Sequence, residues 1–112
     1  KFNYLKFMVN TNYIGSIVKI LENPNPAVFN NTILFTKFRV QFPQIRNSQI
    51  VTLVFWGNLA SDVHNYYQVN DYIIIEGYLG LNNQQFFNKY NQNLKKFEIT
   101  VLKIYPFFLN SN

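Results

Sequence analysis

The feature that most constrains the fold is a series of short apolar segments, each ended by turn-forming residues. Tyr13 to Leu21 alternates between apolar and polar residues, contains several β-branched side chains, and stops at the proline-containing cluster 22–26. Thr32 to Phe42 alternates in the same way and ends at Pro43, which cannot donate a hydrogen bond to a strand ladder. Because alternation of period two is typical of half-buried strands, both segments are predicted to be β-strands.

Three further strands and one helix are predicted downstream. Gln49 to Trp56 is a nearly continuous apolar strand that Gly57 ends, Tyr72 to Leu79 is a similar strand, and Lys96 to Tyr105 alternates again. Between the third and fourth strands, Asn58 to Gln68 places apolar residues at the spacing of one helical face. The residues of that face are Leu59, Ala60, Val63 and Tyr67, and Asn58 is in position to cap the helix.

Five strands with one short helix between the third and fourth describe the OB-fold, a five-stranded Greek-key barrel. We therefore expect an all-β protein of this fold. A chain of 112 residues is one domain on ordinary expectations. The predicted domain spans 1–112, with a core from about 12 to 105 and short flanking segments.

The composition favours a binding protein over an enzyme. Ten Lys and Arg residues stand against five Asp and Glu, which gives a net charge of +5 and a pI near 9.5, and 19 % of the residues are aromatic. A basic, aromatic-rich domain is typical of nucleic-acid binding. There is no cysteine and one histidine, His64, and the five acidic residues are scattered. A zinc site needs three or four suitable ligands, so we expect no metal, no cofactor and no catalytic cluster.

The residue usage points to an A/T-rich genome. Asn and Gln supply 25 residues, and Lys outnumbers Arg eight to two. These preferred residues have A/T-rich codons, which fits the DNA of an organelle, an endosymbiont or a parasite. No apolar run reaches the roughly 18 residues of a membrane span, and no membrane partner is expected.

One segment carries a family resemblance. Val51 to Leu79 contains a strand ending in an aromatic-glycine pair, Trp56-Gly57, followed by Asn58-Leu59-Ala60. A short helix with Tyr66-Tyr67 and a strand closing on Glu76-Gly77-Tyr78-Leu79 complete the pattern. This order resembles the bacterial and organellar single-stranded DNA-binding proteins, and small plastid-encoded reading frames of that kind in particular. Together with the base bias, the resemblance implies an organelle, a plastid first and a mitochondrion second.

The likeness extends more loosely from about Asn12 to Tyr105. It implies the OB-fold and assembly into a homo-oligomer, a dimer or a tetramer, and it leaves the number of subunits open. Nothing acidic follows Glu98. We therefore expect no recruitment of partners through the acidic C-terminal tail that bacterial members carry.

The resemblance also implies a binding site made of stacking rings and phosphate-binding cations. By analogy, the face of the third strand with Ile50, Thr52, Val54 and Trp56 is the open one, and Trp56 stands in the place of a stacking aromatic. The alternative is that Trp56 lies in the core or in a subunit interface.

Other candidates come from three segments. The polar stretch Gly80 to Leu94 and the start of the last strand combine rings with lysines, Lys37 and Arg39 alternate outward from the second strand, and Arg46 lies in the next turn. These rings could instead pack within their own hairpin or on a neighbouring subunit, and the charges could simply be solvated. The predicted site residues are Trp56, Phe86, Phe87, Tyr90, Lys37, Arg39, Arg46, Thr52, Lys89, Lys95 and Lys96.

The first functional hypothesis is single-stranded DNA binding with little sequence preference, in the replication or maintenance of organelle DNA. The second is an OB-fold assembly module that binds protein through its apolar faces and has lost or weakened DNA binding. An RNA-binding or primosome-type OB-fold protein is the third. The sequence does not separate DNA from RNA preference.

Overall fold

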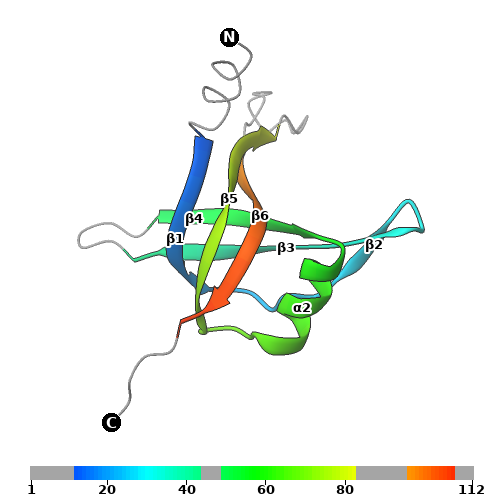
Figure 1. The fold of residues 1–112 in the computed structure, drawn as a ribbon, viewed down its shortest axis with the longest axis horizontal. Coiled ribbons are helices and arrows are strands. Elements are labelled where there is room, and N and C mark those ends of the chain that lie inside the picture. Colours follow the sequence, from blue (N-terminus) through cyan, green and yellow to red (C-terminus); the bar gives the residue numbers. More distant parts are fainter. Residues whose placement is uncertain (1–11, 44–48, 83–95, 108–112) are drawn as a thin grey trace, which may run out of the picture.

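The predicted strands form one strongly curved sheet in the computed structural model of the chain, which describes residues 12–43, 49–82 and 96–107 (Figure 1). The elements follow the chain in the order β1 (Tyr13–Ile20), β2 (Ala27–Phe29), β3 (Ile33–Phe42), β4 (Gln49–Trp56), α2 (Asn58–Tyr66), β5 (Tyr72–Asn82) and β6 (Lys96–Pro106). The side chains of Leu81, Asn82 and Lys96 lie outside the description.

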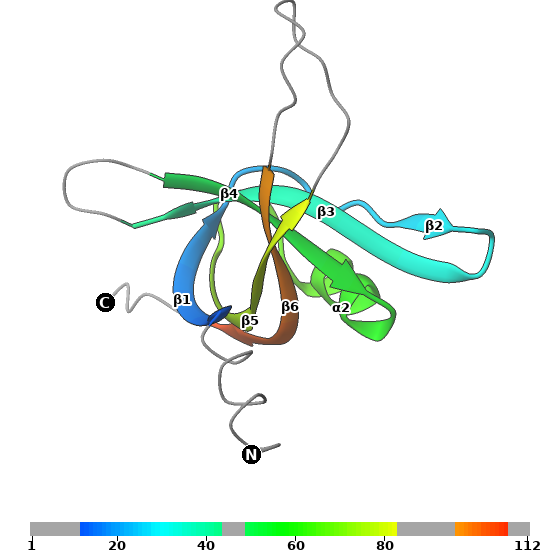
Figure 2. The same cartoon turned by 90° about the horizontal axis from the view of Figure 1, so that it is seen from above.

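The sheet closes into a barrel. Its strand order is β1-β5-β6-β4-β3-β2, and a short pairing of β1 with β3, Lys19 with Gln41 and Ile20 with Val40, joins the two sides (Figure 2). The β4–β6 pair is parallel and the others are antiparallel. The predicted fold class, a five-stranded OB-fold barrel with one helix before the fourth predicted strand, is confirmed.

The barrel interior is filled from alternate positions of the strands. Phe38 of β3 stacks on Phe55 of β4 with ring centroids 5.2 Å apart, and both rings are buried. Each such ring removed from water stabilises the fold by roughly 1.5–3 kcal/mol. The helix α2 packs against β3, β4 and β6 through Ala60 and Val63, which are fully buried. Of the predicted helical face, Ala60 and Val63 are confirmed as buried and Leu59 is half-buried against the core, whereas Tyr67 packs against the core from beyond the helix.

The backbones of β5 and β6 approach each other closely at Gly77. A Cβ atom at this position would lie 2.1 Å from the carbonyl oxygen of Thr100 in β6, so only glycine is accommodated. The β5–β6 register shifts at the same place, because Glu76 pairs with Lys103 and Gly77 pairs with Val101. The extra residue in β6 is a β-bulge, which increases the local twist.

One strand was not predicted. β2 has only three residues, and it pairs with the start of β3 across a turn in which the Thr32 N–H donates to the Phe29 carbonyl at 3.2 Å. Asn30 and Asn31 in this turn have φ angles of 53° and 60°. Asparagine tolerates this left-handed region, and consecutive left-handed residues are typical of hairpin turns.

The element ends also differ from prediction. Gly57, with φ 63°, occupies the N-cap position of α2, its carbonyl accepts the Ala60 N–H at 3.0 Å, and Asn58 is already helical. The prediction of Asn58 as cap was therefore wrong, and no side chain caps the helix. The helix ends at Tyr66 rather than Gln68, because Tyr67 takes up extended backbone.

A hydrogen bond between side chains joins β1 and β5 on the outer side of the sheet. The Tyr13 hydroxyl donates to Oε1 of Glu76, and the Tyr13 ring meets the edge of Tyr78 at 5.2 Å. The bond to the carboxylate, with smaller effects of desolvation and of the negative charge, raises the pKa of Tyr13 from its ordinary value of 10.0 to about 12. The protonated phenol is therefore favoured in the folded chain.

Gly77→Ala is expected to lower the free energy of unfolding by about 3 kcal/mol, since the new methyl group overlaps the Thr100 carbonyl. Gly80→Ala in the same strand is the matched control. A Cβ atom added at Gly80 would meet no other atom within 4 Å, and a change within about 0.5 kcal/mol is expected. Urea unfolding of both variants measures the difference, and equal losses would contradict the proposed overlap.

Tyr13→Phe is expected to remove a pH-dependent part of the stability. A pKa raised from 10.0 to about 12 by folding contributes stability that is complete below pH 10 and is lost as the pH rises through 12. The advantage of the parent chain over Tyr13→Phe should therefore shrink across this window in chemical unfolding. Glu76→Gln should shift the ultraviolet titration of one tyrosine to lower pH. If Glu76→Gln and the parent chain titrate identically, the bond to Glu76 is not what raises the pKa of Tyr13.

Candidate nucleic-acid interface

Three aromatic rings gather where the β2–β3 hairpin meets the end of β4. Phe35 and Trp56 are direct cross-strand partners with ring centroids 5.4 Å apart, and Phe29 meets both rings edge-on at 6.3 and 5.9 Å. We call Phe29, Phe35 and Trp56 the aromatic cluster. Trp56 is 41 % exposed and Phe29 is 46 % exposed. The cluster therefore presents ring surface to solvent while its members hold each other in place.

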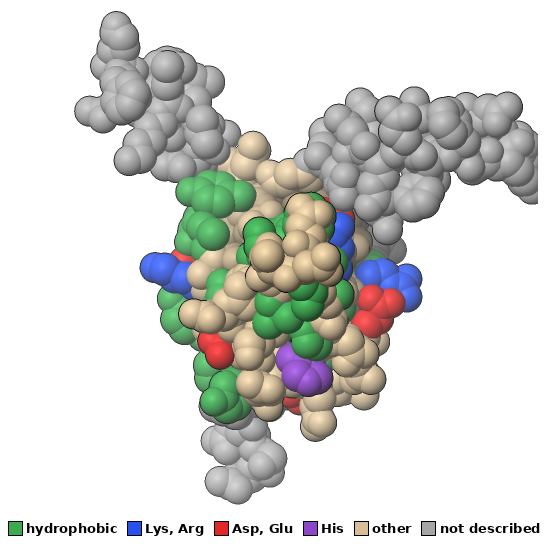
Figure 3. Space-filling model, turned by 90° about the vertical axis from the view of Figure 1, so that its right-hand side faces the viewer, with side chains coloured by type: hydrophobic (Ala, Val, Ile, Leu, Met, Phe, Trp, Pro, Cys, Tyr) green, Lys and Arg blue, Asp and Glu red, His purple; other side chains and the backbone are tan. Residues whose placement is uncertain are grey.

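The hairpin that carries Phe29 projects from the barrel. Figure 3 looks at that side of the molecule and shows hydrophobic side chains gathered at and beneath the projection, with the charged side chains mostly to either side. Ile33 and Val28 of the hairpin are also exposed. An apolar surface of this kind, bordered by charge, is typical of a binding region.

The face of β4 predicted to be open is open only in part. Ile50 and Trp56 are exposed and Thr52 is half-buried, but Val54 is buried at 3 %. Its neighbours explain the difference, because Val54 lies between Lys37 of β3 and Thr100 of β6 in the middle of the sheet. Trp56 is not part of the barrel core, so the prediction that it could be a core residue is wrong, and its place in a subunit interface stays a prediction.

Lys37 and Arg39 point outward as predicted, but each is engaged in an ion pair. Nζ of Lys37 lies 3.3 Å from Oε2 of Glu98, and Nε of Arg39 lies 2.9 Å from Oε2 of Glu22. Glu22 also accepts the backbone N–H of Arg39 at 2.8 Å, at the gap between the β1 and β2 pairings of β3. These pairs offset the positive charge that a phosphate would meet here.

The charges of the chain are divided unevenly between the described fold and the rest. All five acidic side chains are described, but only four basic ones are, Lys19, Lys37, Arg39 and Lys103. The described side chains therefore sum to a formal charge of −1, and the other six basic residues turn this into the +5 of the whole chain. Those six are Lys1, Lys6, Arg46, Lys89, Lys95 and Lys96.

Several predicted site residues consequently fall outside the described residues. These are Phe86, Phe87, Tyr90, Arg46, Lys89 and Lys95. Lys96 is described only in its backbone, at the start of β6 opposite Asn82. The structure brings Trp56, Thr52, Lys37 and Arg39 onto one face, since they occupy outward positions of the paired strands β3 and β4.

An apolar hollow of about 260 Å³ opens at the end of the barrel where β4 begins. Most of its lining residues lie on the inward-facing side of their strands, and Ile50 is where the outer face of β4 reaches it. Ile50 and Phe97, 57 % and 58 % exposed, stand at this hollow. Phe42 and Gln49, which flank the connection 44–48, also line it. Phe29, Phe35 and Phe97 were not among the predicted site residues. Phe35 could have been predicted from the sequence, because Phe35, Lys37 and Arg39 are alternate residues of one strand and therefore share its outward face.

Other kinds of site find no support in the described ranges. No group of three or more His, Asp or Glu side chains within them could hold a metal ion, and no helix within them is long and apolar enough to cross a membrane. Nδ1 of His64 lies 2.8 Å from the Pro24 carbonyl oxygen, so this nitrogen joins α2 to the segment between β1 and β2.

Comparison with known proteins gives a consistent result. No family model matches the chain. The ycf41 protein of Trieres chinensis, named as a single-stranded DNA-binding protein, is 38 % identical over 104 residues, which cover 89 % of this chain and 92 % of the relative.

Two solved structures are also similar to the chain. The SSB domain of a Synechococcus protein has a TM-score of 0.68 at 23 % identity and covers 84 % of this chain and 93 % of that domain, a likeness of fold. The second single-stranded DNA-binding protein of Mycobacterium smegmatis, SSBb, has a TM-score of 0.63 at 27 % identity and covers 85 % and 87 %.

Proposed function

The chain belongs to the family of single-stranded DNA-binding proteins, and on that premise we propose that it binds single-stranded DNA with little sequence preference. The observation that carries the proposal is the aromatic cluster, which exposes ring surface on the outer face of the barrel. Any base offers a flat face to such a ring, so stacking does not require a particular sequence.

The cluster is built to hold a stacking ring still. Phe35 supports the Trp56 ring at a tilt of 35°, and Phe29 stands edge-on to both. A ring that is already fixed loses little conformational freedom when a base stacks on it. Each stacked base contributes about 1–3 kcal/mol, as judged by removal of the ring.

The outer face of β4 offers a path for the bound DNA strand. It runs from Trp56 through Thr52 to Ile50, beside the apolar hollow with Phe97. Six residue steps of a strand span about 20 Å. This length accommodates a few nucleotides, at the lower end of the 4–16 that an OB-fold is known to cover.

Phosphate binding rests on two sets of cations. Lys37 and Arg39 lie on the proposed path, and their exposed ion pairs are of a kind worth roughly 0–1 kcal/mol, so phosphates can exchange with the carboxylates. The larger set is Arg46, Lys89, Lys95 and Lys96, in or beside segments that connect strands next to the apolar hollow. We assign most of the electrostatic attraction to this second set.

The proposed setting is the replication or maintenance of plastid DNA, in an A/T-rich genome, with a mitochondrion as the alternative. The relative named ycf41 supports a plastid origin. No enzymatic step is part of the proposal.

The proposal includes assembly into a homo-oligomer. Among the described strands, β1 pairs with β3 only at Lys19 and Ile20, so the first residues of β1 have an unpaired edge on that side. Such an edge favours pairing with another chain.

A protein-assembly role is the second candidate, and one observation favours it. The hairpin exposes Val28, Phe29 and Ile33 together, which is a surface that another protein could cover. In that case a partner would bury Trp56 and DNA binding would be weak or absent. RNA in place of DNA is a nearer alternative, which competition between DNA and RNA strands of equal sequence decides.

Trp56→Ala is expected to weaken binding of oligo(dT) about ten-fold or more, because the stacking surface is lost. Tyr105→Ala is the matched control, since Tyr105 is 42 % exposed but belongs to the outer side of the β5–β6 pair. Fluorescence anisotropy of labelled oligo(dT) measures the affinities. In the parent chain, DNA should also quench the emission of Trp56, the one tryptophan. A parent chain that neither binds nor quenches at low salt would instead favour the assembly module.

The salt dependence of binding separates the two sets of cations. Replacing Lys89, Lys95 and Lys96 with Gln should reduce the slope of log affinity against log salt by up to about 2, at about 0.7 for each single-strand phosphate contact. Lys37→Gln should change the slope by less, because Lys37 exchanges one ion pair for another. Titrations at several salt concentrations measure both slopes. A larger effect of Lys37→Gln would reverse the assignment.

A further inference from the structure

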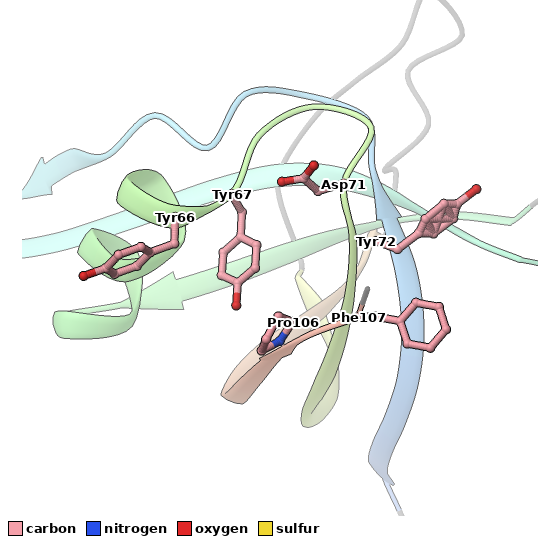
Figure 4. Close-up of a pocket in the computed structure, with 6 residues that line it drawn as sticks. All are labelled: Tyr66, Tyr67, Asp71, Tyr72, Pro106 and Phe107. Atoms are coloured by element: carbon pink, nitrogen blue, oxygen red, sulfur yellow. The ribbon is translucent and has the colours of Figure 1, made fainter. Parts of the chain in front are cut away.

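A second hollow region lies at the other end of α2, away from Trp56. It has a volume of about 370 Å³ and sits where the end of the helix meets the start of β5 and the end of β6 (Figure 4). The residues that line it are Tyr66, Tyr67, Asp71, Tyr72, Pro106 and Phe107. Its size is within the roughly 300–1,000 Å³ of ligand sites. The proposed DNA path does not use it.

The hollow combines aromatic rings with one carboxylate. Figure 4 shows the Tyr67 ring extending downward from the end of the helix toward Pro106, with the Asp71 carboxylate above it, and the Tyr66 ring extending to the left. The Tyr66 side chain is unusually open, at 74 % exposed. A cation over the face of such a ring is attracted to it, and a neighbouring carboxylate adds a charge partner.

The Asp71 carboxylate is fixed in place and still has room for a ligand. Its Oδ2 accepts the backbone N–H of Gln68 at 3.0 Å, and among the described residues it has no further hydrogen bond or ion pair. No described Lys or Arg lines the hollow. Burial raises the pKa of Tyr67, and the negative charges of Asp71 and Asp62 raise it further. The region around Tyr67 is therefore anionic, within a described fold whose charge is −1.

The hollow continues into a polar neighbour of about 420 Å³. Tyr66, Tyr67 and Asp71 line both. The polar part adds Asn23, Asn25, Asn65 and Gln68, whose amide groups can both donate and accept hydrogen bonds, and His64. A ligand that follows both parts is therefore extended, with an apolar and cationic group in one part and hydrogen-bonding groups in the other. A peptide has this character.

We propose that the joined hollows bind an extended basic segment of another protein, with an arginine or lysine side chain against Tyr66 and Tyr67 and its charge on Asp71. The aliphatic stem of such a side chain packs on rings while the charged end meets the carboxylate. The peptide backbone crosses the amide-lined part. Nucleic acid is the less suitable occupant, because its phosphates would meet the Asp71 carboxylate, and no described Lys or Arg lines either hollow.

The test uses the full chain labelled with ¹⁵N and a short capped peptide of glycine and serine around one arginine. The expected result is a set of shifts at the backbone amides of Tyr66, Tyr67 and Asp71. Asp71→Asn keeps an oxygen for the Gln68 N–H but loses the charge, and it should weaken binding about five-fold. Glu76→Gln is the control variant. It removes one negative charge from the outer side of strand β5, away from the hollow, and should leave the affinity for the peptide unchanged. The same peptide with citrulline, the neutral analogue of arginine, should bind the parent chain weakly. Its affinity should equal that of the arginine peptide for Asp71→Asn.

Tyr66→Ala is the second variant, since an exposed ring can be removed with little effect on folding, and it should weaken binding about three-fold. Equal binding of the citrulline peptide, or an unchanged affinity in Asp71→Asn, would overturn the proposal. So would oligo(dT) that shifts the same amides and displaces the peptide. Peptide binding only after removal of residues 108–112 would show that the chain's own end is the occupant. The proposal does not depend on DNA binding, so a chain that ignores oligo(dT) still gives a clear result here.

Discussion

The close approach of Gly77 to the Thr100 carbonyl is the contact on which the closed barrel depends. It coincides with the bulge in β6, where Leu102 is the extra residue between the partners of Glu76 and Gly77. The added twist turns β5 and its neighbour β1 around the core, so that β1 reaches β3 at Lys19 and Ile20. Closure in turn fixes the end of β4 over α2, and with it the place of the aromatic cluster. The geometry of the proposed DNA path is therefore set by a contact on the far side of the barrel.

The sequence predicted the parts of the fold in which burial is one-sided. Alternation in β1, β3 and β6 follows directly from a sheet with one face in the core, and the apolar spacing of α2 follows from its packing over the barrel end. β2 could not be found this way, because a strand of three exposed residues shows no alternation. Trp56 was found through its motif and Phe35 could have been found through its step with Lys37. The ion pairs could not have been predicted from the sequence, since Lys37 and Glu98 are 61 residues apart and only the folded sheet brings them together.

The division of charge separates the stability of the barrel from its proposed affinity for DNA. The described fold has four basic and five acidic side chains, and the excess of basic residues lies in 1–11, 44–48 and 83–96. Substitutions in those segments can therefore change the net charge while the described side chains stay the same. The hollow at the C-terminal end of α2 is lined by Asp71 and by no described Lys or Arg. The two proposed sites, near the two ends of α2, would therefore bind ligands of opposite charge.

The strand order has a consequence for how the chain acquires its structure. β6 is last in the sequence but lies in the middle of the sheet, between β5 and β4. Until β6 is synthesised, both of those neighbours have an unpaired edge, and the parallel pairing with β4 joins Leu53 to Ile99, which are 99 − 53 = 46 residues apart in the sequence. Contacts of such long sequence separation slow folding and leave edges open to wrong pairing. A ribosome must therefore release the chain through β6 before the barrel can form, and a product interrupted before β6 would be prone to aggregation.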